Sequence, residues 1–223
     1  PNNKYVLLAL IGATAGQGVV WYTGQFYALF FLQITLKLDF LTTYTLIGAS
    51  LLLGTPFFIF FGWLSDKIGR LKIILAGCLI AAVTYFPMFK ALTHYTNPDL
   101  EAFRNKTKVS VAANPEECKF HLFVGPWTKY TSCDRAKDVL TKSSLNFETI
   151  PSAPGVPVKV TINGTEITGW EGDGYKAKVD EVNALLKAAG YPKEADKSKV
   201  NYPMILLILF IFLIYVTMVY GPI

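Results

Sequence analysis

The sequence has few of the residues that build metal and redox centres. Its 223 residues include only two His and three Cys, which is too few for a multi-ligand metal centre. No set of a nucleophile, a base and an oxyanion-stabilising group can be assembled from the chain. The sequence therefore indicates no enzyme activity, and it predicts neither a cofactor nor a metal site.

Charge is nearly absent from one half of the chain. Of the 37 Lys, Arg, Asp and Glu residues, 29 lie between residues 91 and 201, where 15 are basic and 14 are acidic. Although the net charge is +5, this charged region has almost none of it and contains no stripe of Lys and Arg. Nucleic-acid binding is therefore not expected.

The weakly charged half consists of four long apolar runs without an internal acid, Lys or Arg. A hydrocarbon core of about 30 Å needs about 20 helical residues, and the first run is too long to be a signal peptide. The sequence predicts an all-α membrane fold, with spans at about 5–36, 40–65 and 72–92 in a first region, 1–92. An extracytoplasmic α+β insert at 93–201 precedes a fourth, truncated span at 202–223.

Short links between the spans predict the orientation of the chain. The link at 65–72 has three basic residues and one acid, which favours the cytoplasmic side. The insert at 93–201 then lies outside the cytoplasm. The chain begins without Met and stops within apolar residues, so we expect it to be a fragment of a longer protein.

The insert shows patterns typical of a small α+β domain. Alternating apolar residues in 156–162, followed by Asn163-Gly164 and 165–168, predict a hairpin with a type I′ turn. Pro157 predicts that the first of these strands lies at a sheet edge. Apolar residues recur every three or four positions in 179–189 and stop before Gly190, which predicts a helix.

Two of the three cysteines lie in the insert. In an exported compartment, Cys118 and Cys133 are expected to form a disulfide that closes a loop of about 16 residues and contributes roughly 3 kcal/mol. The alternative is a metal site made by Cys118, His121 and Cys133. Cys78 lies by itself in the third predicted span.

The first span has polar residues at helical spacing. Thr14, Gln17, Trp21 and Gln25 recur every three or four positions, and therefore share one face of a regular helix, with Tyr22 beside it. Polar groups in lipid are costly unless they face a cavity or partner helices. We interpret this face as the lining of a substrate pathway, and interhelical hydrogen bonding is the alternative.

The link between the second and third spans has an unusual set of spaced residues. It resembles the signature loop of the major facilitator superfamily, in which Gly, Asp, Gly-Arg and a basic residue recur between the second and third helices of each six-helix half. The resemblance implies a gating role for this loop. The matching residues, with the adjacent lysine, are Gly62, Asp66, Lys67, Gly69, Arg70 and Lys72.

Two further stretches, 13–25 and 219–223, are similar to the seventh and tenth helices of bacterial metabolite:H⁺ symporters related to proline/betaine and dicarboxylate carriers. The resemblance implies a fragment covering helices seven to ten of a 12-helix bundle in the bacterial inner membrane, with the insert in the periplasm. It implies symport of a small organic solute, such as an organic acid or a betaine-like osmolyte, with a proton. The partners would be the lipid bilayer and the remaining helices.

Two other functions are compatible with four spans and a large external insert. A tetraspanin-like membrane organiser would need a Cys-Cys-Gly motif and further paired cysteines, whereas the insert offers only Cys118 and Cys133. A receptor would instead use the insert to bind a ligand or a partner.

Overall fold

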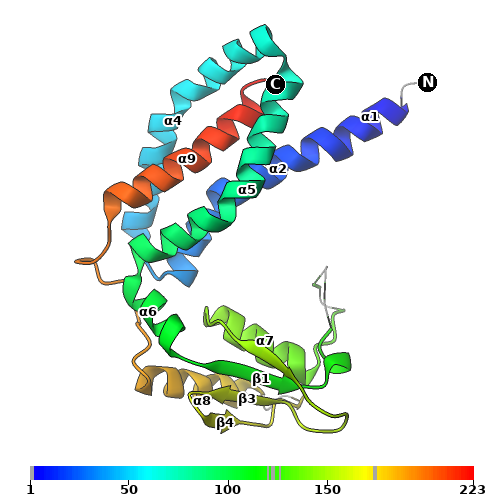
Figure 1. Ribbon diagram of the computed structural model, residues 1–223, viewed down its shortest axis with the longest axis vertical. Helices are drawn as coiled ribbons and strands as arrows, with labels where there is room; N and C mark the ends of the chain where they lie inside the picture. Colours follow the sequence, from blue (N-terminus) through cyan, green and yellow to red (C-terminus); the bar gives the residue numbers. More distant parts are fainter. Residues whose placement is uncertain (1–2, 120, 122–123, 126, 173–174) are drawn as a thin grey trace. The chain divides into compact units, whose positions relative to one another are not determined.

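The computed structural model describes residues 3–119, 121, 124–125, 127–172 and 175–223. The chain divides into two compact units, one made of residues 1–98 and 194–223 and the other of residues 99–193. Figure 1 shows the helices of the first unit and the mixed sheet of the second.

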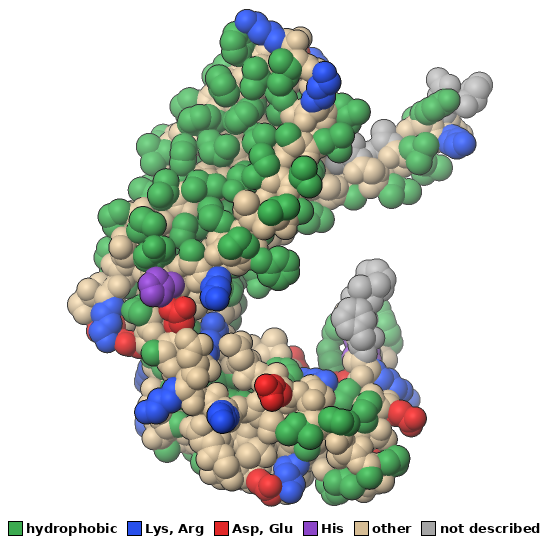
Figure 2. All heavy atoms as spheres, viewed as in Figure 1, with side chains coloured by type: hydrophobic (Ala, Val, Ile, Leu, Met, Phe, Trp, Pro, Cys, Tyr) green, Lys and Arg blue, Asp and Glu red, His purple; other side chains and the backbone are tan. Residues whose placement is uncertain are grey.

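Among its described residues, the first unit contains four helices that are long and apolar enough to cross a membrane, at 3–35, 40–68, 70–96 and 202–220. This agrees with the prediction of a mainly helical chain with four helices that could span a membrane. The last three are α4 (Phe40–Ile68), α5 (Arg70–Thr96) and α9 (Tyr202–Tyr220). Figure 2 shows hydrophobic side chains over most of the visible surface of this unit.

The first span is not a regular α-helix. Three α-helical segments, α1 (Asn3–Ala9), α2 (Ala15–Trp21) and α3 (Ala28–Phe30), alternate with three π-helical segments. The π-helical segments are η1 (Leu10–Thr14), η2 (Tyr22–Tyr27) and η3 (Phe31–Thr35). Such widened turns are rare and often occur at functional sites. The sequence pattern gave no indication of them.

Local capping explains where the later spans begin and end. The carboxylate of Asp39 accepts a hydrogen bond from the Thr42 backbone N–H at 3.0 Å and caps α4. Gly69 separates α4 from α5 with a φ of 100°, a conformation that glycine adopts without steric cost. Asn201 caps α9 by accepting a hydrogen bond from the Met204 N–H.

The fourth span, α9, is the central helix of the membrane unit. It packs against α4, α5 and the first span, and Figure 1 shows it between α4 and α5. Close approach depends on glycine: a Cβ on Gly54 of α4 would lie 2.1 Å from Leu213 Cδ2, and one on Gly77 of α5 would lie 2.9 Å from Met218 Cβ. Small residues bring helix backbones together in this way in membranes.

The second unit is built on a four-stranded sheet with the order β2-β1-β3-β4. β1 pairs parallel with β2, and the other pairs are antiparallel. The strands are β1 (Val109–Ala113), β2 (Glu148–Pro151), β3 (Lys159–Ile162) and β4 (Thr165–Ile167). The helices are α6 (Pro98–Lys106), the 3₁₀ turn η4 (Pro115–Glu117), α7 (Ser132–Lys142) and α8 (Tyr175–Ala188).

The core of this second unit lies on one face of the sheet. Alternate residues of β1 and β3 are buried and form one cluster with apolar residues of α7 and α8. Trp170, which is fully buried, belongs to the same cluster. The opposite sheet face has the partly exposed and mostly polar residues of the alternation, Ser110, Ala112, Lys159 and Thr161, as expected for a sheet with one packed face.

The hairpin prediction is confirmed, since Asn163 and Gly164 join β3 to β4 with φ values of 48° and 88°. The predicted helix is also confirmed, as α8. The prediction of an edge strand was wrong, because β3 lies between β1 and β4. Pro157 lies two residues before the first residue of β3, so it removes no backbone N–H donor from the sheet.

Candidate functional site

The candidate site is a cavity of about 370 Å³ between the first span and α4. On one side it is bordered by Trp21 and by η2, whose wide turn carries Gln25. On the other side it is bordered by Tyr44 and Gly48 of α4. The remaining lining residues are Phe26, Leu29, Ile47 and Leu51.

The amide of Gln25 is the unusual group in this cavity. The side chain is 8% exposed, and neither its Nε2 nor its Oε1 has a hydrogen-bond partner among the described residues. Leaving a buried polar group unpaired costs about 1–3 kcal/mol, and such groups in native proteins usually have a ligand, a water or a functional reason. Gln25 can donate two hydrogen bonds and accept two.

Two other residues of the predicted polar face contact α9. Gln17 Nε2 donates to the Val219 carbonyl at 3.4 Å, and the side chain is buried. The ring of Trp21 meets that of Tyr220 edge-on, with 4.6 Å between centroids. Gln17 therefore makes the interhelical hydrogen bond of the alternative interpretation, whereas Trp21 both packs on α9 and borders the cavity.

Thr14 and Tyr22 lie away from this cavity. Both side chains are exposed within the chain, and neither borders the cavity that contains Gln25. The structure thus brings together two of the five predicted pathway residues, Trp21 and Gln25.

The signature-like link forms a compact connection between α4 and α5. Arg70 Nη2 and Asp66 Oδ1 form an exposed ion pair at 3.2 Å, and Lys67 Nζ lies 4.0 Å from the centre of the Trp63 ring. Gly62 is a point of close packing, because a Cβ there would lie 3.1 Å from the Gly221 carbonyl. Lys72 is exposed in the first turn of α5.

A polar cluster that the sequence did not reveal joins the other ends of the spans. The buried Asn97 donates through Nδ2 to the Leu36 carbonyl at 2.9 Å. Lys197 Nζ pairs with Asp39 Oδ1 at 3.0 Å. The hydrogen bond from Thr42, followed by the Lys197 contact, holds the pKa of Asp39 below its ordinary value. This cluster ties residues 36–39 to both connections of the insert.

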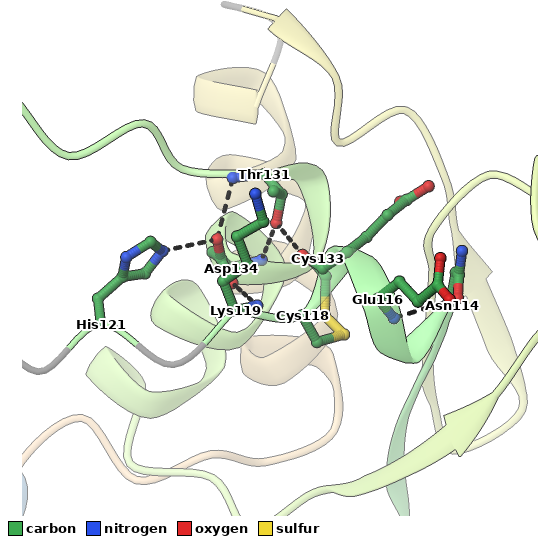
Figure 3. The surroundings of a disulfide bond; sticks show 9 residues. Asn114, Glu116, Cys118, Lys119, His121, Thr131, Cys133 and Asp134 are labelled. Atoms are coloured by element: carbon green, nitrogen blue, oxygen red, sulfur yellow. Dashed lines mark hydrogen bonds and ion pairs between the residues drawn. A yellow bond between two sulfur atoms is a disulfide. The ribbon is translucent and has the colours of Figure 1, made fainter.

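The predicted disulfide between Cys118 and Cys133 is present, so neither sulfur is free for the alternative metal site. Figure 3 shows His121 pointing instead toward Asp134, with 3.0 Å between Nε2 and Oδ2. Asp134 also accepts the backbone N–H groups of Lys119 and Thr131 at 3.0 and 3.1 Å. The loop closed by the disulfide is thus held at both ends by one carboxylate.

These contacts make the stability of the insert depend on pH. Burial by itself would raise the pKa of Asp134, but the hydrogen bonds from His121, Thr131 and Lys119 outweigh it and lower the pKa. When the pKa of a carboxyl group is lower in the folded state than in the unfolded state, its ionised form stabilises the fold. This stabilisation is fully present above the pKa of the unfolded state, and it is lost as the pH falls through the pKa of the folded state. We expect the loss to occur below about pH 4.

Asp134→Asn removes this acid-dependent stabilisation. We expect the variant to lose about 1–3 kcal/mol at neutral pH, because two backbone donors and His121 lose a charged acceptor, and to show a flatter stability profile in acid. Hydrogen exchange of the β1 amides between roughly pH 3 and 7 measures both effects. The matched control is Asp138→Asn, an exposed carboxylate of α7 paired with Lys142; equal profiles for both variants would contradict the assignment.

The insert has a groove of its own, with a volume of about 510 Å³. Arg104 and Lys108 border it, together with Glu148 of β2 and Thr161 of β3. Arg104 Nε donates to the Ser144 carbonyl at 2.6 Å, and burial lowers the pKa of its guanidinium. The groove therefore combines a fixed cation with residues from the open face of the sheet.

Comparisons with protein families, with curated proteins and with solved structures give no match to this chain.

Proposed function

We propose that the chain supplies four spans of a secondary active carrier for small organic solutes, which works by alternating access. The observation that carries this proposal is the buried amide of Gln25, which has no partner among the described residues and borders a cavity between two spans. Because an unpaired amide destabilises a membrane helix, its presence is best explained by a ligand that bonds to it.

The chemistry of the lining favours a small zwitterion or organic acid. The amide N–H₂ of Gln25 donates to a carboxylate, and its carbonyl accepts from an ammonium or hydroxyl group. Trp21, Phe26 and Tyr44 border the same cavity, and aromatic faces attract quaternary ammonium groups. A carboxylate and a methylated ammonium within one solute, as in a betaine-like osmolyte, match both features.

The remaining parts of the proposal follow from the resemblance to the major facilitator superfamily. The four spans correspond to helices seven to ten of twelve, in a bacterial inner membrane with the insert in the periplasm. The disulfide fits an oxidising compartment. Since the predicted spans contain no Asp or Glu, the group that couples transport to a proton belongs to the remaining helices.

The signature-like link acts in this proposal as the cytoplasmic latch. Its ion pair is exposed, and exposed pairs contribute only about 0–1 kcal/mol. A latch of this strength forms and breaks in each cycle without holding the carrier in one state. Gly69 supplies the sharp turn that brings Asp66 and Arg70 together.

Solute protection of an introduced cysteine tests the cavity. Gly48 borders it, and a Cβ there would meet no atom of the described residues within 4 Å. In a background with Cys78→Ser, we expect glycine betaine or succinate to slow the modification of Gly48→Cys by a methanethiosulfonate reagent. Gly18→Cys is the control, because it also has open space but does not border the cavity.

The proposal would be contradicted if no carboxylate or betaine in a wider series slowed the modification of Gly48→Cys or of Gly18→Cys, because this would mean that no solute binds in this cavity.

The groove of the insert supports a second candidate function, that of a receptor. Arg104 and Lys108 would bind an anionic ligand there. Ligand binding that survives replacement of Gln25 but is lost on replacement of Lys108 would favour the receptor over the carrier.

A further inference from the structure

The loop closed by the disulfide exposes large apolar side chains on the insert. Val124 and Trp127 are 63% and 76% exposed, and Tyr130 is 38% exposed. We call Val124, Trp127 and Tyr130, with the flanking Lys119 and Lys129, the aromatic loop. Exposed apolar side chains gathered in this way mark an interaction site more often than a solvated surface.

The aromatic loop holds its tryptophan in a defined turn. The Thr128 N–H donates to the Gly125 carbonyl at 2.9 Å, and the Gly125 N–H donates to Thr128 Oγ1 at 2.9 Å. The indole of Trp127 lies so close to Gly125 that a Cβ there would be 2.4 Å from it. The disulfide and the contacts of Asp134 fix the two ends of the loop.

The composition of the aromatic loop matches the membrane interface. Tryptophan and tyrosine concentrate at the level of the lipid headgroups, where their rings meet both apolar and polar surroundings. Residues 119–132 contain two Lys and no Asp or Glu, and basic residues near an anionic leaflet are attracted to it.

A bilayer surface lies within reach of the insert. Only Asn97 separates the end of the membrane-spanning α5 from α6, and thirteen residues separate α8 from α9. Both connections are therefore short, since each residue of extended chain spans at most about 3.6 Å.

We propose that the aromatic loop docks on the lipid bilayer, with Trp127 and Val124 entering the headgroup region and Lys119 and Lys129 contacting anionic lipid. This interaction depends only on the presence of a membrane and not on the transport activity proposed above.

Fluorescence of the full chain in lipid nanodiscs tests the proposal. With Cys78→Ser, a Val124→Cys variant is labelled with an environment-sensitive dye, and nitroxide lipids are included as quenchers. We expect blue-shifted emission and quenching by headgroup-level nitroxides in discs that contain phosphatidylglycerol. The matched control is Ala184→Cys on α8, an exposed position, where we expect neither effect.

Changes in the loop and in the lipid separate the contribution of the apolar side chains from that of the lysines. We expect Trp127→Ser to abolish the quenching at position 124. The fold should stay intact, because the Trp127 side chain is exposed. Lys119→Gln with Lys129→Gln, or discs without anionic lipid, lower the docked-to-undocked ratio by roughly thirtyfold.

Two outcomes overturn the proposal. One is emission at position 124 that matches the water-exposed control at position 184. The other is a blue shift without quenching by lipid nitroxides, because it would show that protein covers the loop, either a second copy or another part of the chain.

Discussion

Replacing both Cys118 and Cys133 by serine is expected to destabilise the insert by about 3 kcal/mol. The bridge spans a sequence separation of 15 residues, and a loop of that length gives this value from the conformational freedom it removes from the unfolded chain. Cys133 is also fully buried in the core of the insert, so the serine hydroxyl adds a polar group to an apolar site.

Hydrogen exchange of the β1 and β3 amides measures this loss, and it reports on the insert separately from the spans. We expect exchange by opening of the insert to become roughly a hundredfold faster, which corresponds to about 3 kcal/mol. Cys78→Ser is the control, because Cys78 is a free thiol in α5. Unchanged β1 exchange in the double variant would contradict a stabilising role for the disulfide.

Gly54→Ala is expected to destabilise the membrane unit by about 1–3 kcal/mol. The added Cβ would lie 2.7 Å from Leu213 Cγ, as well as against Cδ2, and Leu213 is almost fully buried. To remove this steric overlap, α9 must move away from α4 or Leu213 must change its rotamer. Overpacking of this kind typically costs about 1–3 kcal/mol. Thermal unfolding in detergent measures the effect.

Gly48→Ala on the same helix is the matched control. In the described part of the chain, a Cβ at Gly48 meets nothing within 4 Å, so this variant is expected to gain the roughly 0.5–1 kcal/mol by which alanine exceeds glycine in a helix. Leu213→Ala should cost less stability in the Gly54→Ala background than in the unchanged chain, because it removes the atoms that the added Cβ meets. If both glycine variants were equally stable, the close packing of α4 on α9 would be wrong.

The four spans were predictable because one property, uncharged length, determines them. The central position of α9 was not predicted, although its hydropathy is the highest of the four spans. A helix that is apolar on every side is usually buried, and this was the available signal. Two glycines of the same helix also differ, since Gly54 packs on Leu213 whereas Gly48 has no described atom near it.

In the insert, local signals predicted only local structure. The turn at Asn163-Gly164 and the apolar period of α8 depend on adjacent residues, so they could be recognised from the sequence. The parallel pairing of β1 with β2 joins residues such as Ser110 and Glu148, which are far apart in the chain. All four residues of β2 are exposed. Because no face of this strand is buried, its sequence has no alternation of polar and apolar residues by which it could be recognised.

For the candidate site, spacing identified a set of polar residues but not their individual environments. Gln17 and Gln25 fit the same helical period, yet Gln17 bonds to α9 and Gln25 does not. The prediction that Thr14 shares their face assumed 3.6 residues per turn. The π-helical segments η1 and η2 widen the turns and change which residues share a face.

Solute uptake by the reconstituted carrier with Gln25→Leu tests the proposed solute-binding role of Gln25. We predict that uptake of the transported solute falls by roughly threefold to tenfold, the value of one lost hydrogen bond. The melting temperature should stay unchanged or rise, because leucine removes an unpaired buried amide. Unchanged uptake, or a loss of uptake together with a lower melting temperature, would contradict a solute-binding role and indicate that Gln25 bonds to another helix.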